Sequence, residues 1–213
     1  MNDNNHLLGY YNYTVILTYV GVLTGFFGIL CCFKGNVFEA VICLMVAGFC
    51  DMFDGTVAST MERNEQEKTF GIQIDSLADL ICFGVLPATI LFSLNPNSML
   101  CMAVALLAVL CALIRLAFFN VDEQQRQLTS AEPRSIYYGL PVTLAAVFVP
   151  IAFALEHFFP LRPGTIVLFT MLIMALMFVI PFKIKKPKML GKCAFIICGV
   201  AEIALLIASG SFM

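Results

Sequence analysis

Four aspartates at fixed spacings are the residues of this chain best suited to chemistry. They belong to the pattern D-x-x-D-G-x-x-A and, after a gap, G-x-x-x-D-x-x-x-D, with members Asp51, Asp54, Gly55, Ala58, Gly71, Asp75 and Asp79. All four carboxylates fall within otherwise apolar stretches, where one unpaired Asp costs roughly 2.5 to 3.5 kcal/mol at the centre of a membrane. Four such residues together therefore indicate bound cations.

The spacing predicts one pocket between two helices. Asp51 and Asp54 are three residues apart and Asp75 and Asp79 four, so each pair lies on one stripe of a helix. The small residues of the pattern leave no bulk where the helix backbones come close. An all-oxygen pocket favours Mg²⁺, Mn²⁺ or Ca²⁺ over zinc or copper. Two divalent cations, Mg²⁺ or Mn²⁺, would neutralise four carboxylates, and such a site can stabilise charge on the attacking and leaving oxygens of a phosphate.

The composition is that of an integral membrane protein. Hydrophobic residues make up 61% and charged residues 12% of the 213 positions, against about 25% charged residues in a soluble domain. The apolar segments have the length of membrane helices and lack the alternation of barrel strands. The nine cysteines fall in or beside these segments and form no C-x-x-C pair. They are therefore interpreted as free, apolar packing residues.

Hydropathy predicts an all-α fold with seven membrane-spanning segments in a single domain, 1–213. The predicted segments are 13–33, 37–60, 69–94, 97–120, 137–158, 164–182 and 191–211. The connections are short, apart from a polar stretch, 121–136, interpreted as a loop outside the membrane.

The basic residues favour a cytoplasmic N-terminus. In that topology the inside loops collect most of the Lys and Arg residues, whereas the outside loops hold only Lys34 and Arg162. The aspartate cluster then lies near the cytoplasmic face, across the short loop MERNEQEK. The alternatives are an ion or proton pathway in a transporter, or isolated polar contacts between helices. A transporter site usually lies near the midplane, often with internal repeats, so the position near one surface favours metal-dependent phosphoryl transfer.

The aspartate pattern resembles the signature of the CDP-alcohol phosphotransferases. These membrane enzymes transfer a phosphatidyl or similar group from a CDP-linked donor to an alcohol and release CMP. The stretch FGIQIDSLADLICFGVLPA (70–88) is similar to the phosphatidylserine synthase version of the motif, as are RLAFFNV (115–121) and YYGLPVTLAA (137–146). The resemblance covers about 13–188 and implies a six-helix core, with about one additional helix near 191–211.

The resemblance implies a reaction and roles for residues. The donor would be CDP-diacylglycerol and the acceptor L-serine, giving phosphatidylserine and CMP, in a homodimer at the cytoplasmic side of the cell membrane, with no nucleic acid as a partner. Asp51, Asp54 and Asp75 would carry most of the metal ligation. Asp79 would add to it and act as the general base toward the serine hydroxyl. Anionic acceptors such as glycerol phosphate or inositol phosphate would require several basic residues near the metals. Of the Lys and Arg residues in the six-helix core, only Arg115 lies within the predicted membrane-spanning segments.

One position departs from the family pattern. The family usually has Arg where this chain has Ser59. Arg63, one helical turn further on, is a candidate substitute, and the alternative is a solvated loop cation. The predicted donor-binding residues are Gly55, Ala58, Ser59, Arg63 and Gly71, with the small residues allowing close approach of the nucleotide.

The acceptor and lipid contacts are predicted from isolated polar residues. Arg115 and Asn120 are candidates for the serine carboxylate, because Arg115 needs an anionic partner inside a membrane. The alternatives are that Arg115 pairs with the aspartate cluster or extends to the membrane surface. Weaker candidates in the polar stretch are Arg134 and Ser135. The tract KIKKPK, with Lys183, Lys185 and Lys186, either anchors the chain by the positive-inside rule or captures a lipid phosphate.

Overall fold

The structure is a computed structural model that describes residues 9–58, 60–129, 136–156 and 158–185. Outside this part lie the predicted segment 191–211 and the site candidates Ser59, Arg134, Ser135 and Lys186. The single domain and the additional helix therefore stay predictions.

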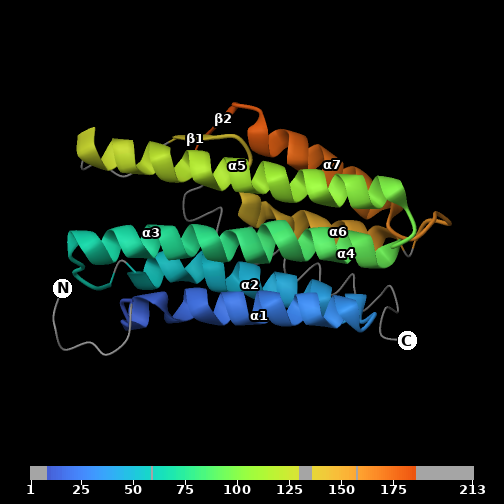
Figure 1. Cartoon of the computed structure of the whole chain (residues 1–213), viewed down its shortest axis with the longest axis horizontal. Coiled ribbons are helices and arrows are strands. Elements are labelled where there is room, and N and C mark those ends of the chain that lie inside the picture. Colours follow the sequence, from blue (N-terminus) through green and yellow to red (C-terminus); the bar gives the residue numbers. More distant parts are fainter. Residues whose placement is uncertain (1–8, 59, 130–135, 157, 186–213) are drawn as a thin grey trace.

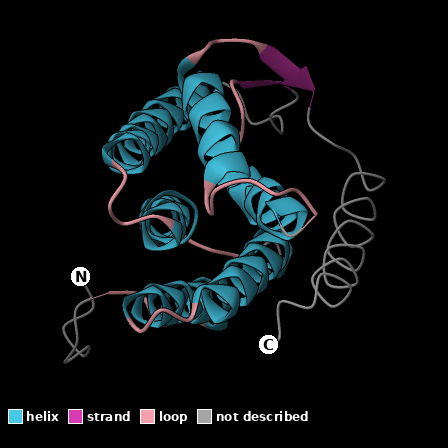
Figure 2. Ribbon diagram, turned by 90° about the vertical axis from the view of Figure 1, so that its right-hand side faces the viewer, coloured by secondary structure: helices cyan, strands magenta, loops and turns pink. Residues whose placement is uncertain are grey.

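The described chain is a bundle of helices that run along one long axis (Figure 1), seen end-on in Figure 2. The helices are α1 (Ile16–Phe33), α2 (Val37–Ala58), α3 (Glu65–Asp79), α4 (Leu86–Leu94), α5 (Met99–Thr129), α6 (Ala145–Glu156) and α7 (Thr165–Val179). A π-helical segment, η2 (Leu80–Val85), joins α3 to α4, and short 3₁₀ turns precede α1 and α6, namely η1 (Tyr13–Val15) and η3 (Val142–Leu144). Two short strands, β1 (Ile136–Tyr138) and β2 (Lys183–Lys185), pair antiparallel.

Among the described residues, three helical segments have the length and composition to cross a membrane: Tyr13–Phe33, Glu65–Leu94 and Met99–Arg126. Together with the apolar composition, these segments fit the predicted integral membrane protein. Many large apolar side chains on α1 and α5 are exposed, Leu23 to 70% and Leu106 to 67%. Apolar side chains on the outside of a helical bundle are what a lipid-facing surface requires.

Two helices extend beyond the apolar runs that predicted them. α3 begins at Glu65, because Asn64 and Glu67 form a reciprocal cap in which each side chain accepts from the other residue's backbone N–H, at 2.8 and 2.9 Å. α5 continues to Thr129 through residues interpreted above as a loop. Glu, Gln and Arg are good helix formers, so the helix persists after the apolar sequence ends. The prediction of a loop was therefore wrong for 121–129.

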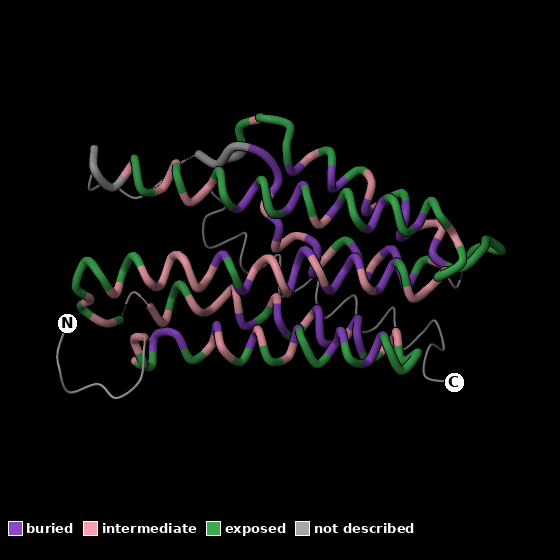
Figure 3. Tube along the Cα trace, in the orientation of Figure 1, coloured by how far each residue is buried: buried purple, intermediate pink, exposed green. Residues whose placement is uncertain are grey.

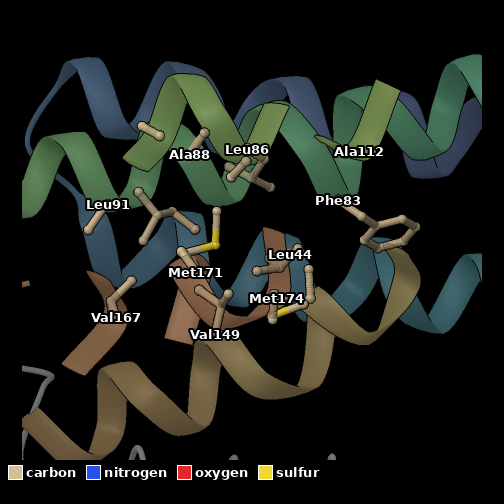
Figure 4. Packing of buried hydrophobic residues seen from close by; sticks show 14 of the residues in the cluster. Leu44, Phe83, Leu86, Ala88, Leu91, Ala112, Val149, Val167, Met171 and Met174 are labelled. Carbon is tan, nitrogen blue, oxygen red and sulfur yellow. The ribbon is translucent and has the colours of Figure 1, made fainter. Parts of the chain in front are cut away.

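The apolar core lies where α2, α4, α5, α6 and α7 meet, and it fills the middle of the bundle (Figure 3). Leu44, Leu86 and Val149 are completely buried in it (Figure 4). Close packing depends on glycine where α2 crosses α6, since a β-carbon on Gly48 would lie 2.5 Å from that of Ala146. This core fixes α2 and the α3–α4 segment relative to each other, and these elements carry the four aspartates.

Candidate active site

The four aspartates meet at the interface of α2 and α3. Carboxylate oxygens of Asp51, Asp54 and Asp75 lie within 4.8 Å of one another. Asp79 contacts Asp51 through its side chain, and Asp75 contacts Asp54 in the same way. The predicted convergence of the two pairs is therefore present, and the three residues expected to carry most of the metal ligation form the tight group.

A third helix contributes to the cluster. The Oγ1 atom of Thr18, on α1, donates a hydrogen bond to Oδ2 of Asp54 at 3.2 Å. Thr18 is almost fully buried. Thr18 was not among the predicted site residues, although Thr14 and Thr18 form a pair of hydroxyls four residues apart in a segment that is otherwise apolar. Such a pair on one helix face is the signal that could have identified it.

The donor set fits divalent cations. It consists of carboxylate oxygens with one hydroxyl beside them, which suits hard cations such as Mg²⁺ and Mn²⁺. Within the described part of the chain, no Lys or Arg forms an ion pair with these four carboxyl groups. Like charges in contact repel strongly in a medium of low dielectric constant. Bound cations are the simplest means of holding this arrangement together.

A cavity of about 310 Å³ opens beside the cluster. Asp54 and Asp75 form part of its wall, and α1, α2, α3 and α5 all contribute to it. Its lining residues are Thr14, Val15, Thr18, Asp54, Gly55, Ala58, Arg63, Lys68, Gly71, Ile72, Asp75 and Glu123. Of the five predicted donor-binding residues, four line this one cavity, and the fifth, Ser59, lies outside the described residues. Lys68 and Glu123 were not predicted.

Arg63 lies directly over Gly71. A β-carbon built on Gly71 would be 3.0 Å from the Nη1 atom of Arg63, so the guanidinium rests where a side chain would otherwise stand. Gly55, by contrast, faces open space, with nothing within 4 Å of a β-carbon there. The loop from α2 to α3 therefore places a cation, Arg63, in the cavity lining. In the sequence, Arg63 follows Ser59 by four residues.

The two predicted acceptor residues on α5 lie away from this cavity. Asn120 accepts a hydrogen bond from the hydroxyl of Ser76 at 2.7 Å and donates to Gln73 at 3.4 Å, which ties α5 to α3. Arg115 is 7% exposed, and its guanidinium carbon lies 5.7 Å from the ring centre of Phe119. This burial does not fit a side chain that extends to the membrane surface. The acceptor roles of Arg115 and Asn120 stay predictions.

The basic tract begins in the strand pair. Lys183 pairs with Tyr138, and Lys185 with Ile136, so the tract lies beside the segment that follows α5. Lys183 is exposed. The proposed contact of Lys183, Lys185 and Lys186 with a lipid phosphate stays a prediction.

The π-helical segment η2 begins directly after Asp79. Its Cys82 is 3% exposed, and the thiol donates to the carbonyl oxygen of Gly21 on α1 at 3.3 Å. Cys82 lines one small cavity together with all four aspartates. π-helical turns inside α-helices are frequent at functional sites. The segment changes the helical register directly after Asp79, which hydropathy alone does not reveal.

Comparison with known proteins identifies relatives that are similar to this chain in sequence. The chain is similar to the CDP-diacylglycerol–serine O-phosphatidyltransferase of Saccharomyces cerevisiae, with 34% identity over 157 residues, 69% of this chain and 54% of that protein. It is 33% identical over 135 residues to the archaetidylserine synthase of Methanothermobacter thermautotrophicus, covering 63% of this chain and 54% of that one. A Helicobacter pylori CDP-diacylglycerol–serine O-phosphatidyltransferase is 35% identical over 137 residues, 62% of this chain and 54% of that protein. The chain spans about half the length of these curated relatives.

A family match covers most of the chain. Residues 11–181 match the CDP-alcohol phosphatidyltransferase family, and this range contains the aspartate cluster and every residue that lines the adjoining cavity. The expected resemblance is thus confirmed, and the chain belongs to the CDP-alcohol phosphatidyltransferase family.

Proposed function

We propose that this protein transfers the phosphatidyl group of CDP-diacylglycerol to the hydroxyl of L-serine, giving phosphatidylserine and CMP. The names of the relatives support the serine acceptor. The observation that carries the proposal is the cavity that adjoins the aspartate cluster and places Gly55, Arg63 and Gly71 beside Asp54 and Asp75. Small residues and a cation beside a group of carboxylates suit a nucleoside diphosphate that is held through divalent cations.

The chemical step can be written with residues of this chain. The serine hydroxyl oxygen bonds to the phosphorus that carries the diacylglycerol, the bond from that phosphorus to the CMP oxygen breaks, and CMP leaves. Asp79 accepts the hydroxyl proton. The contact between Asp79 and Asp51 supports this role, since it keeps the base beside the group that orients the donor. Asp51, Asp54 and Asp75 hold the donor end of the site.

Two divalent cations, Mg²⁺ or Mn²⁺, would bind the diphosphate oxygens and stabilise the negative charge on the departing CMP. Asp51, Asp54, Asp75 and Asp79 would hold them. Gly55 and Ala58 leave room for the nucleotide against α2, Gly71 does so against α3, and Arg63 supplies a cation for a donor phosphate in place of the Arg that Ser59 replaces.

The basic residues at the end of the bundle that carries the site support a cytoplasmic location for the site. The C-terminal end of α2, the N-terminal end of α3 and the C-terminal end of α5 lie together at the left of Figure 1. Arg63, Lys68 and Arg126 are at this end, whereas Lys34 follows α1 at the other. The positive-inside rule then assigns the site to the cytoplasmic face. Homodimer formation, implied by the family, stays a prediction.

The test is CMP release by the purified full chain in detergent with CDP-diacylglycerol. L-Serine is compared with glycerol 3-phosphate and with inositol phosphate, each with Mn²⁺, with Mg²⁺ or with EDTA. We expect serine-dependent and metal-dependent release that Asp79→Asn abolishes, while Asp122→Asn, on α5 and outside the cavity lining, retains it. Release only with another acceptor would overturn the serine assignment. No release with any acceptor would count against the activity itself.

A further inference from the structure

A further acidic side chain, from α5, lines the cavity that adjoins the aspartate cluster. Glu123, on α5, lines the cavity together with Asp54, Asp75 and Gly71. It reaches this position because α5 continues as a helix beyond the apolar sequence. Its side chain is 14% exposed, so the carboxylate is largely removed from solvent.

The carboxylate of Glu123 is fixed in place by Arg126. The Nε atom of Arg126 donates to Oε2 at 3.0 Å and Nη2 donates to Oε1 at 2.5 Å, a two-pronged pairing. Such charge-assisted pairs are strong and fix geometry. A carboxylate has about four lone-pair sites, and the pairing with Arg126 uses two of them.

The height of Glu123 along the bundle suits an acceptor at the cluster. The bond from Ser76 to Asn120 places residue 120 of α5 level with the turn of α3 that carries Asp75. Glu123 comes three residues later on α5, about one helical turn, or roughly 5 Å, toward the cavity mouth. Asp75 directly precedes Ser76 and lines the same cavity, so Glu123 is the acidic residue of α5 that lies about one helical turn from Asp75 along the bundle.

We infer that Glu123 receives the ammonium group of the acceptor and selects an amine-bearing alcohol over an anionic alcohol phosphate. This inference rests on the proposed transferase function and deepens it. A carboxylate attracts the serine ammonium in this largely desolvated position, whereas it repels the phosphate of glycerol 3-phosphate. The cavity also contains Arg63 and Lys68, which come from the α2–α3 side, whereas the residue that α5 contributes to its lining is Glu123.

The test compares two acceptors that differ only in the ammonium group. L-Serine and 3-hydroxypropanoate share the hydroxyl and the carboxylate, and 3-hydroxypropanoate has hydrogen in place of the amine. CMP release is measured with each acceptor for the unmodified chain and for Glu123→Gln, Glu123→Asp, Arg126→Gln and Asp122→Asn. Thermal unfolding in the same detergent confirms that each variant is folded.

We expect Glu123→Gln to raise the KM for L-serine about 10- to 100-fold, the size of a lost hydrogen bond to a charged group, with little change in kcat. Its kcat/KM for 3-hydroxypropanoate should stay within about threefold of the unmodified value, and Glu123→Asp should recover part of the serine affinity. Arg126→Gln keeps the carboxylate and should raise the serine KM less than Glu123→Gln does. Asp122→Asn, on the same helix but outside the cavity, should match the unmodified chain.

Two results would overturn the inference while leaving the transferase function intact. The first is an unchanged serine KM in a folded Glu123→Gln variant. The second is an equal loss with both acceptors in Glu123→Gln and in Arg126→Gln, which would mean that the ion pair only supports the helix. If the unmodified chain instead releases no CMP with serine but does so with an anionic acceptor, the serine assignment fails and the inference fails with it.

Discussion

A β-carbon on Gly25 of α1 would lie 2.7 Å from the Sγ atom of Cys82 in η2. Real β-carbons do not approach a neighbour this closely, so α1 needs glycine where it contacts the π-helical segment. Cys82 follows Asp79 by three residues. The contact therefore couples the packing of α1 to the position of the proposed base.

Gly25→Ala should destabilise the protein by about 1–3 kcal/mol, the usual cost of overpacking a filled interior, and should lower kcat. Adding Cys82→Ala removes the clashing sulfur and should restore much of the thermal stability. Gly21→Ala is the matched control, because its β-carbon would meet that of Cys50 at an ordinary 3.6 Å. The unfolding temperatures of these variants are measured in detergent. A double variant that is no more stable than Gly25→Ala alone would contradict this account.

Asp54→Asn should have opposite effects with and without metal. In EDTA the substitution removes a negative charge from the crowded cluster and should raise the unfolding temperature. With Mn²⁺, the unmodified chain should gain about 2.7 kcal/mol at 100 times the dissociation constant, and the variant should lose most of that gain. Thermal unfolding across a Mn²⁺ titration measures both effects, with Asp122→Asn as the control. If the unfolding temperature of the unmodified chain changed with neither Mn²⁺ nor EDTA, the result would contradict the proposed metal site.

Gly71→Ala should weaken donor binding through Arg63. The new β-carbon would lie 3.0 Å from Nη1, so the guanidinium has to move. We expect the KM for CDP-diacylglycerol to rise about three- to tenfold, which corresponds to roughly 1 kcal/mol, with a smaller change in kcat. In an Arg63→Gln background the same substitution should add little, since the two changes act on one group. If the two substitutions had fully additive effects on this KM, Gly71 would act on donor binding independently of Arg63.

Glu156→Gln should destabilise the far end of the bundle without affecting substrate binding. The Glu156 carboxylate accepts from the backbone N–H groups of Gly164, Ile166 and Val167, at 2.7, 2.9 and 3.1 Å, and so caps the start of α7. The amide has one acceptor oxygen in place of two, and we expect a loss of about 1.5–3 kcal/mol. Arg162→Gln, in the same connection and exposed, serves as the control. A change in the KM for either substrate, at unchanged stability, would argue against this role.

The sequence was sufficient for the class of protein and for the centre of the site. The spacing of Asp51, Asp54, Asp75 and Asp79 predicts two helical stripes that converge, and three of these residues do form a tight group. This works because helical periodicity is a local property, and because four acids in apolar helices have few acceptable surroundings. The family followed from the same pattern.

The tertiary structure decided what surrounds that centre. Thr18 and Glu123 reach the cavity from helices that lie far from the aspartates in sequence, and no local pattern pairs them. The rotation of α5 directs Asn120 to Ser76 and leaves Glu123 in the cavity wall, while the acceptor roles of Arg115 and Asn120 stay predictions. Helix rotation and the π-helical register after Asp79 are fixed by packing between helices, at contacts such as Gly25 with Cys82. Hydropathy and motif spacing carry no information about those contacts. The sequence therefore determined which residues form the aspartate cluster, and only the packing of the helices determined which residues surround it.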